Sequence, residues 1–178
     1  MIRFRELSEN EIHKIREIDR EEEIFEFYEY DKGSLKLESR RITVLQFDPL
    51  ELGKMIQNQI RLKSKGGKIT GAFDKEQLIG VASVERKKRG SQLNYCKMYI
   101  LYVSKDYRGM RIGQKLLEES KKTGKEFGAD KLYISATPTK NTIDFYLSNG
   151  AILTTELDKE LYDLEPEDIH LELDVEKQ

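Results

Sequence analysis

The 178-residue sequence predicts an α/β fold, with one mixed, mostly antiparallel sheet that carries helices on both of its faces. Two apolar segments, 68–73 and 77–85, flank a three-residue polar turn and predict an antiparallel hairpin. Further on, an apolar run over 94–103, an amphipathic stretch over 112–127 and a short apolar run over 131–136 predict a β-α-β unit. Hairpins followed by such a unit bring both strand directions into one sheet. The length is that of one domain, which buries about two-thirds of its unfolded surface.

The first eighteen residues predict a strand and a helix. Residues 1–7 alternate apolar and polar side chains, as a strand does. Ser8 is followed three residues later by Glu11, which is the pattern of a capping box, so a helix is expected to begin at this point. Three isoleucines at helical spacing give this helix an apolar side: Ile12, Ile15 and Ile18.

The next segments carry weaker patterns. The aromatic-rich stretch 24–30 is expected to continue as a second helix. Residues 35–47 are expected to form two short strands that turn through 39–41. Asp48 at the N-cap and Pro49 at the first helical position then predict a third helix, which the glycines after residue 65 end.

The C-terminal part continues the α/β pattern. Gly128 is expected to end the amphipathic helix, and Gly150 a shorter helix over about 141–149. Residues 151–155 and 169–175 predict two final strands joined by a long acidic loop. We therefore expect one domain over 1–178, made of an N-terminal part, 1–66, and a core, 67–178.

The composition excludes several functions. With 31 Lys and Arg against 33 Asp and Glu, the net charge is −2, which argues against nucleic-acid binding. Cys96 is the only cysteine, so an intramolecular disulfide is impossible, and His13 and His170 lie in no metal-ligand spacing. No apolar run approaches the roughly 18 residues of a membrane helix. A signal peptide is not evident either, so we expect a cytoplasmic protein with no membrane and no metal.

A basic, glycine-bearing loop stands between the central strand and the amphipathic helix. It reads Arg108-Gly109-Met110-Arg111-Ile112-Gly113. A strand, such a loop and a helix start direct several backbone N–H groups to one point at the positive end of a helix dipole, which favours phosphate. The loop lacks the Lys-Ser/Thr pair of a Walker A motif and the glycines of a Rossmann fingerprint. Nucleotide binding through this loop remains a weaker alternative.

Two segments resemble a known family. Residues 103–113 resemble motif A of the GNAT acyl-CoA-dependent N-acyltransferases, except that Arg111 stands where a glycine is common. Residues 141–151 resemble the family's motif B, with its Phe-Tyr pair and its glycine in register. Asn141 is two residues closer to the tyrosine than the asparagine of the usual pattern, and Thr139 occupies that aligned position. The resemblance covers roughly residues 68 to 175.

The resemblance implies a fold, a cofactor and a reaction: a GNAT-like sheet, acetyl-CoA, and direct transfer of an acetyl group to an amine. Backbone N–H groups of residues 109 to 114 would cradle the pyrophosphate of coenzyme A. Pantetheine would lie between two splayed strands that end at Val103 and near Ala136. Since Arg111 has a Cβ, we expect the loop to close with ordinary dihedral angles and the Arg111 side chain to add a phosphate contact. The implied cofactor-binding residues are Leu101, Val103, Arg108, Gly109, Met110, Arg111, Ile112, Gly113, Gln114, Asn141 and Tyr146.

The resemblance also suggests catalytic groups. Tyr146 is the expected general acid for the leaving thiolate, with plain core packing as the other interpretation. A backbone N–H near Leu101 is the family-like oxyanion donor. Many members carry a glutamate in the central strand, but Tyr99 stands at about that place here, so the base is open between Glu85 and a water chain. Asn141 is either a cofactor contact or the N-cap of its helix.

The acceptor is less determined. It is a small-molecule amine or a protein or peptide amine, bound by a monomer or a homodimer. By resemblance, residues 1–66 wall the acceptor pocket, where aromatic and glutamate side chains suit a cation, although core packing and a solvated face explain them too. The basic stretch 86–89 is expected to be a solvated hairpin tip. An acyl-CoA sensor or regulatory module without efficient turnover is the alternative function, favoured by the missing strand carboxylate.

Overall fold

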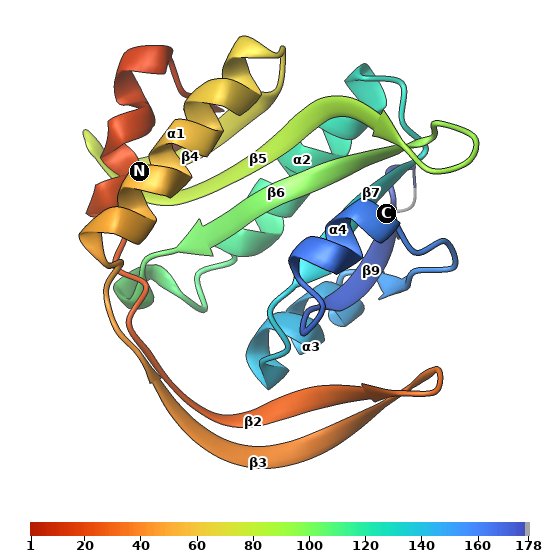
Figure 1. The fold of residues 1–178 in the computed structure, drawn as a ribbon. Helices are drawn as coiled ribbons and strands as arrows, with labels where there is room; N and C mark the ends of the chain where they lie inside the picture. Colours follow the sequence, from red (N-terminus) through yellow and green to blue (C-terminus); the bar gives the residue numbers. More distant parts are fainter. Residues whose placement is uncertain (177–178) are drawn as a thin grey trace.

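The computed structural model describes residues 1–176 and contains one seven-stranded sheet in the order β1-β4-β5-β6-β7-β9-β8 (Figure 1). Neighbouring strands are antiparallel except for β6 and β7, which are parallel. The predicted mixed, mostly antiparallel sheet is thereby confirmed. In sheet order the strands are β1 Ile2–Glu6, β4 Lys68–Asp74, β5 Gln77–Arg89, β6 Tyr95–Val103, β7 Lys131–Ala136, β9 Ile169–Asp174 and β8 Ile152–Leu153.

Helices cover both faces of the sheet, as predicted. On one face lie the 3-10 helix η1 (Glu9–Glu17) and α1 (Pro49–Ser64), whose apolar side chains pack on β4 and β5. The short helix α4 (Lys159–Leu164) lies on the same face in Figure 1. On the other face lie α2 (Ile112–Glu126) and α3 (Lys140–Ser148). Among residues 1–176, no helix is both long and apolar enough to cross a bilayer.

Local capping signals fixed the helix starts correctly. Ser8 and Glu11 form the predicted capping box, because the Ser8 backbone N–H donates to Glu11 Oε2 at 3.1 Å. At α1, Asp48 Oδ1 accepts from the Leu50 N–H at 2.9 Å, with Pro49 at the first helical position. These interactions span only two or three residues, so the sequence alone was sufficient to predict them.

The aromatic-rich segment is a strand, so the expected second helix is wrong. It forms β2 (Glu22–Asp31), which pairs with one continuous strand, β3 (Ser34–Val44), instead of the two short strands expected over 35–47. The turn between them has positive φ at both central residues, Lys32 (48°) and Gly33 (90°). Turns of this kind match the twist of paired strands and therefore connect the two strands of a hairpin. We had expected the same residues only to end a helix.

The β2–β3 hairpin stands apart from the main sheet and reaches α3 (Figure 1). The Tyr28 N–H donates to the Pro138 carbonyl at 2.7 Å, and the Tyr28 hydroxyl donates to Asp144 Oδ1 at 2.8 Å. Phe27 forms an isolated bridge with Thr139. The hairpin is therefore attached to the segment that leads from β7 into α3.

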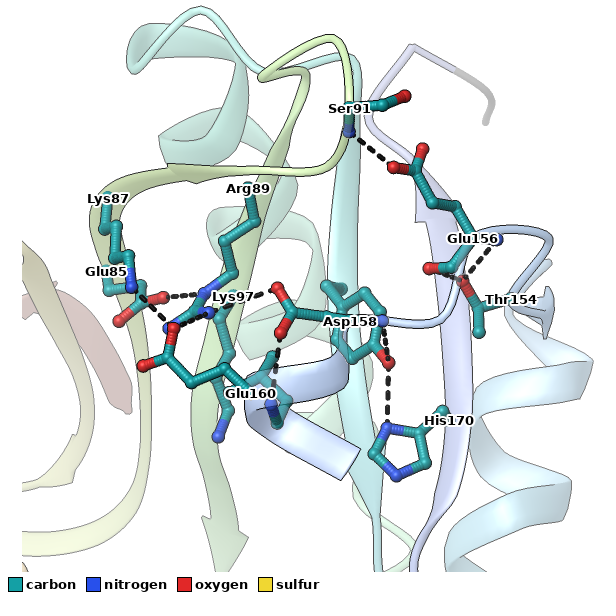
Figure 2. Close-up of polar contacts among 12 residues, drawn as sticks. Glu85, Lys87, Arg89, Ser91, Lys97, Thr154, Glu156, Asp158, Glu160 and His170 are labelled. Atoms are coloured by element: carbon teal, nitrogen blue, oxygen red, sulfur yellow. Dashed lines mark hydrogen bonds and ion pairs between the residues drawn. The ribbon is translucent and has the colours of Figure 1, made fainter. Parts of the chain in front are cut away.

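The basic stretch 86–89 forms the end of β5 and not the expected hairpin tip, and although Arg86 and Lys87 are exposed, its last residue is buried. β5 extends to Arg89, which is 7% exposed. Its guanidinium forms ion pairs with Glu85, with Asp158 (3.1 Å) and with Glu160 (3.2 Å), as Figure 2 shows. Asp158 and Glu160 belong to α4 and its N-cap, a helix in the segment for which we expected a long loop. Arg89 therefore attaches α4 to the sheet.

A hydrogen-bond chain holds the same region from the other side (Figure 2). The Asp158 N–H donates to the Tyr133 hydroxyl at 3.2 Å, and that hydroxyl lies 2.9 Å from His170 Nδ1. His170 Nε2 is 3.2 Å from the Glu165 carbonyl, which only accepts, so Nε2 carries the proton and Nδ1 accepts from Tyr133. Burial lowers the pKa of His170, which keeps this neutral form.

Candidate active site

Strands β6 and β7 separate at the centre of the sheet. Their pairing ends at Met98 and Ile134, while β6 continues along β5 to Val103. On the other side of the gap, the end of β7 pairs with β9 down to Ala136. The expected splayed strands ending at Val103 and near Ala136 are thus present, and the gap leaves room for a ligand to pass between them.

A β-bulge in β6 lies at this gap. Ser83 pairs with Ile100 and Val84 pairs with Met98, so Tyr99 is the extra residue. As a result Met98 packs in the core under α2 and α3, whereas Ile100 packs in the core under η1 and α1. A bulge redirects side chains and frees backbone groups from the ladder. Tyr99 is half-exposed, with Lys97 Nζ 4.7 Å from its ring centre.

The loop after β6 uses the left-handed region twice. Gly109 has φ 78°, and Arg111, the N-cap of α2, has φ 60° and ψ 15°. The expectation that ordinary dihedral angles close this loop is therefore wrong. The Cβ of Arg111 costs about 1 kcal/mol in this conformation relative to glycine. The chain accepts that cost at the position where the related motif usually has a glycine.

The backbone N–H groups of residues 109 to 114 all lie at this helix start. In the described part of the chain, none of them is bonded to an acceptor. The Arg111 side chain does not cap the helix, and the first turn of α2 contains no acidic residue. Unpaired N–H groups and the positive end of the helix dipole together fit a bound anion such as pyrophosphate.

Arg108 positions this loop. Its guanidinium donates to the carbonyls of Val103 (3.3 Å), Arg20 (3.2 Å) and Glu21 (3.2 Å). These bonds connect the loop to the end of β6 and to the segment before β2. The Arg108 guanidinium is thereby occupied by backbone carbonyls of its own chain.

The second motif meets the first at the gap. A Cβ on Gly113 would lie 3.4 Å from the Phe145 ring and 3.8 Å from Val103. Thr139, with its side chain accepting from the Thr142 N–H at 3.3 Å, is the N-cap of α3, so the N-cap interpretation of Asn141 is wrong. Asn141 Nδ2 instead donates to Glu22 Oε1 at 3.0 Å.

Tyr146 lies in the core beneath the gap. It is 6% exposed and packs edge-on against Phe145, with ring centres 5.1 Å apart. Within residues 1–176 its hydroxyl has no hydrogen-bond partner. Burial raises the pKa of Tyr146 well above its usual value, and the nearby Tyr102 raises it further. The phenol is therefore protonated at neutral pH, as a proton donor must be.

The structure reveals a carboxylate that the sequence did not single out. Asp168 directly precedes β9, whose first residue pairs with Ala136 at the end of β7. Burial and the negative charge of Glu165 raise the pKa of Asp168, Lys97 opposes them, and together they bring it to about 6. Asp168 is one of many acidic residues in its loop, so no local pattern marks it. The other candidate base, Glu85, is committed to the ion pair with Arg89.

Known proteins share this architecture. A nourseothricin acetyltransferase superposes with a TM-score of 0.73 at 16% identity, covering 98% of each chain. A putative streptothricin acetyltransferase from Bacillus anthracis str. Ames, in complex with acetyl coenzyme A, gives 0.69 at 18% identity, again over 98% of each chain. A PaiA N-acetyltransferase from Thermoplasma acidophilum, in complex with coenzyme A, gives 0.62 at 18%, over 98% of this chain and 99% of that one. No curated protein matches the sequence.

A family model supplies the decisive comparison. The model of the acetyltransferase (GNAT) family matches residues 13–151, which include the splayed strands, the loop at the start of α2, and α3. It covers more than half of the chain and both of the segments that resembled the family motifs. This protein belongs to the acetyltransferase (GNAT) family.

Proposed function

We propose that this acetyltransferase moves an acetyl group directly from acetyl-CoA to an amine, at the gap between β6 and β7. The observation that carries the proposal is the convergence of unpaired N–H groups at the start of α2 with Tyr146 beneath the same gap. The N–H groups fit a pyrophosphate, and the phenol fits a proton donor. Family membership and the cofactor complexes of similar folds support acetyl-CoA as the donor.

Residues on both sides of the gap would hold the cofactor. The N–H groups of Gly109 to Gln114 would bind the pyrophosphate, and the Arg111 side chain would add positive charge. Arg108 holds the loop in place, and the backbone of Leu101 and Val103 borders the gap. Asn141, which is bonded to Glu22, would have to release that partner to contact the cofactor.

Bound acetyl-CoA supplies the acetyl group as a thioester. Tyr146 would supply its phenolic proton to the departing sulfur, which leaves as a thiol when the amine takes over the acetyl group. A backbone N–H beside the bulge at Tyr99, near Leu101, stabilises the negative charge that develops on the carbonyl oxygen. Counted from the neutral amine, the attacking nitrogen gives up one proton as it becomes an amide nitrogen, and this proton restores the phenol that protonated the sulfur.

The N-terminal part, 1–66, contributes the wall on the acceptor side of one domain that continues through 67–178. The β2–β3 hairpin supports this division, because it attaches to Pro138 next to α3. We place the enzyme in the cytoplasm, as a monomer or homodimer acting on a small-molecule amine or a protein amine.

Release of free thiol from acetyl-CoA in the presence of a panel of amines tests the proposal. We expect amine-dependent thiol release together with an increase in melting temperature on addition of coenzyme A. Binding of coenzyme A without turnover on any amine would instead indicate a sensor. A thermal shift with ATP but not with coenzyme A would contradict the cofactor assignment.

A further inference from the structure

A cavity of about 740 Å³ opens between the β2–β3 hairpin and the loop that precedes β9. One wall comes from residues 27–30 and 38–40 of the hairpin, and the opposite wall from 166–170 and Tyr162. A volume of this size accommodates a drug-sized molecule, well beyond a simple monoamine. The bonds of Tyr28 to Pro138 and Asp144 fix the hairpin wall, and the His170 chain fixes the other.

The cavity borders the segment that leads from β7 into α3 and the start of β9. Asp168 lines it and directly precedes Ile169, which pairs with Ala136 at the splayed end of β7. Pro138, which leads into the helix of Tyr146, also lines it. An amine in the cavity would therefore reach the gap from the side of Asp168.

The cavity carries uncompensated negative charge. Four of its lining residues are carboxylates, and in the part of the chain that the structure describes none of them forms an ion pair: Glu29, Glu38, Glu167 and Asp168. Many carboxylates elsewhere are paired, as Glu11 is with Arg5 (2.7 Å) and Glu172 with Lys131 (2.6 Å). Arg40 is the cation in the lining, and its guanidinium lies over the Phe27 ring, 4.5 Å from the ring centre.

Aromatic side chains complete the lining. Phe27, Tyr28 and Tyr30 come from the hairpin, and Tyr162 from α4. Ammonium groups bind favourably over aromatic faces and beside carboxylates, and both interactions gain strength in a partly enclosed site. The lining therefore favours a ligand that fills the cavity and carries positive charges at several points.

We propose that this cavity is the acceptor site and that the acceptor is a small polycationic amine with at least two ammonium groups. The inference rests on the proposed acetyl transfer and names its substrate class. The reacting ammonium group lies at the Asp168 end, transfers one proton to the Asp168 carboxylate and becomes the neutral nucleophile. Asp168 then releases that proton to water. The remaining ammonium groups stay charged near Glu29 and Glu38.

A series of linear amines tests the substrate class. We would measure kcat/KM at saturating acetyl-CoA for 1-aminobutane, 1,4-diaminobutane, and the triamine and tetraamine built from the same four-carbon units. The expected result is a rise of about tenfold or more in kcat/KM from the monoamine to the triamine, mainly through KM. Equal kcat/KM across the series, or equally efficient acetylation of an uncharged peptide's N-terminus, would overturn the proposal.

Variants locate the effect in the cavity. The double variant Glu29→Gln/Glu38→Gln should raise KM for the triamine about tenfold and leave the monoamine unchanged. Glu118→Gln, on the exposed side of α2 and away from the cavity, is the matched control and should change neither. A double variant that behaves like this control would refute binding of the distal ammonium groups in the cavity.

A binding measurement separates failure of the inference from failure of the proposed function. If no amine is turned over, acetyl transfer itself is refuted, while titration calorimetry with the tetraamine still tests the cavity. Binding to the wild type that weakens about tenfold in the double variant supports the polycation site. Absence of tetraamine binding to the wild type overturns it.

Discussion

Arg89 at the end of β5 and Asp158 at the N-cap of α4 form an ion pair of 3.1 Å across 69 residues of chain (Figure 2). Because α4 and the loop after it form one wall of the proposed acceptor cavity, this pair links the stability of the fold to the shape of that cavity. Arg89 is 7% exposed, so its charge depends on its carboxylate partners and not on water.

Arg89→Ala should therefore be strongly destabilising. Removing one partner leaves Glu85 and Asp158 poorly compensated, which typically costs about 3–5 kcal/mol. For a chain of this size that corresponds to a fall of roughly 10 °C in melting temperature. Lys87→Ala is the matched control, since Lys87 pairs with Glu160 in an exposed ion pair and its loss should cost less than about 1 kcal/mol. Equal melting temperatures for the two variants would contradict this role of Arg89.

The comparison of sequence and structure separates local from long-range features. Ser8 with Glu11, and Asp48 with Pro49, act within one turn, so the sequence predicted both helix starts. The loop between β6 and α2 was predictable because strand, loop and helix are consecutive in the chain. The β2–β3 hairpin was not predicted, because its strands carry an ambiguous pattern and its turn is recognisable only from backbone angles.

The residues that the sequence did not assign depend on distant partners. Arg89 is buried only because α4 returns to β5, and no local pattern indicates that contact. The sequence does not distinguish Asp168 from the other acidic residues of its loop, because its pKa depends on burial and on Lys97 of β6, which folding brings near, as well as on the neighbouring Glu165. Tyr146 could be proposed as the acid because it belongs to a segment that resembles a motif of fixed spacing. A motif indicates the role of its residues from the sequence alone, whereas a carboxylate outside any motif can be singled out only from the structure.

Tyr146→Phe should separate catalysis from cofactor binding. The hydroxyl has no hydrogen-bond partner among the described residues, so its removal should leave the fold intact. Loss of the proton donor should lower kcat by about 10²-fold or more, as for general acids in other enzymes. Coenzyme A affinity, measured by calorimetry, should change less than about threefold. Full activity in this variant would rule out Tyr146 as the acid.

Gly113 offers a pair of variants that tests the cofactor site. A Cβ there would lie 3.4 Å from Phe145, an ordinary contact, so Gly113→Ala should fold and bind coenzyme A nearly as the wild type does. Gly113→Glu adds bulk and a negative charge beside the N–H groups of the loop. We expect it to lose at least about 100-fold in affinity, measured as loss of the thermal shift with coenzyme A. Unchanged affinity in Gly113→Glu would refute the pyrophosphate cradle.

Arg111 allows strain and phosphate contact to be distinguished. Glycine accepts φ 60° without penalty, so Arg111→Gly should raise the free energy of unfolding by up to about 1 kcal/mol. The melting temperature should therefore stay the same or rise slightly. If the Arg111 side chain also contacts the cofactor, the same variant should bind coenzyme A about tenfold more weakly. Arg111→Lys, which retains the charge, should recover part of that affinity. Wild-type affinity in Arg111→Gly would show that the loop binds through its backbone alone.

Asp168→Asn should raise stability and lower activity at the same time. Because the pKa of Asp168 in the folded chain is about 6, above the value of 3.8 for a free side chain, the folded state binds more protons than the unfolded state between these two values. Stability of the wild type therefore falls as pH rises from about 4 to 6, and the cost persists at neutral pH. For this half-buried group we expect Asp168→Asn to gain about 1 kcal/mol, or about 3 °C, at pH 7.5 and nothing at pH 4. In the wild type, kcat/KM should rise with pH near 6 as Asp168 loses its proton. This rise should be absent in Asp168→Asn, and turnover should fall about 10²-fold. The variant could instead gain stability at pH 7.5 and keep both full turnover and the change in kcat/KM near pH 6. That result would exclude Asp168 as the base and leave it only a structural role in the cavity wall.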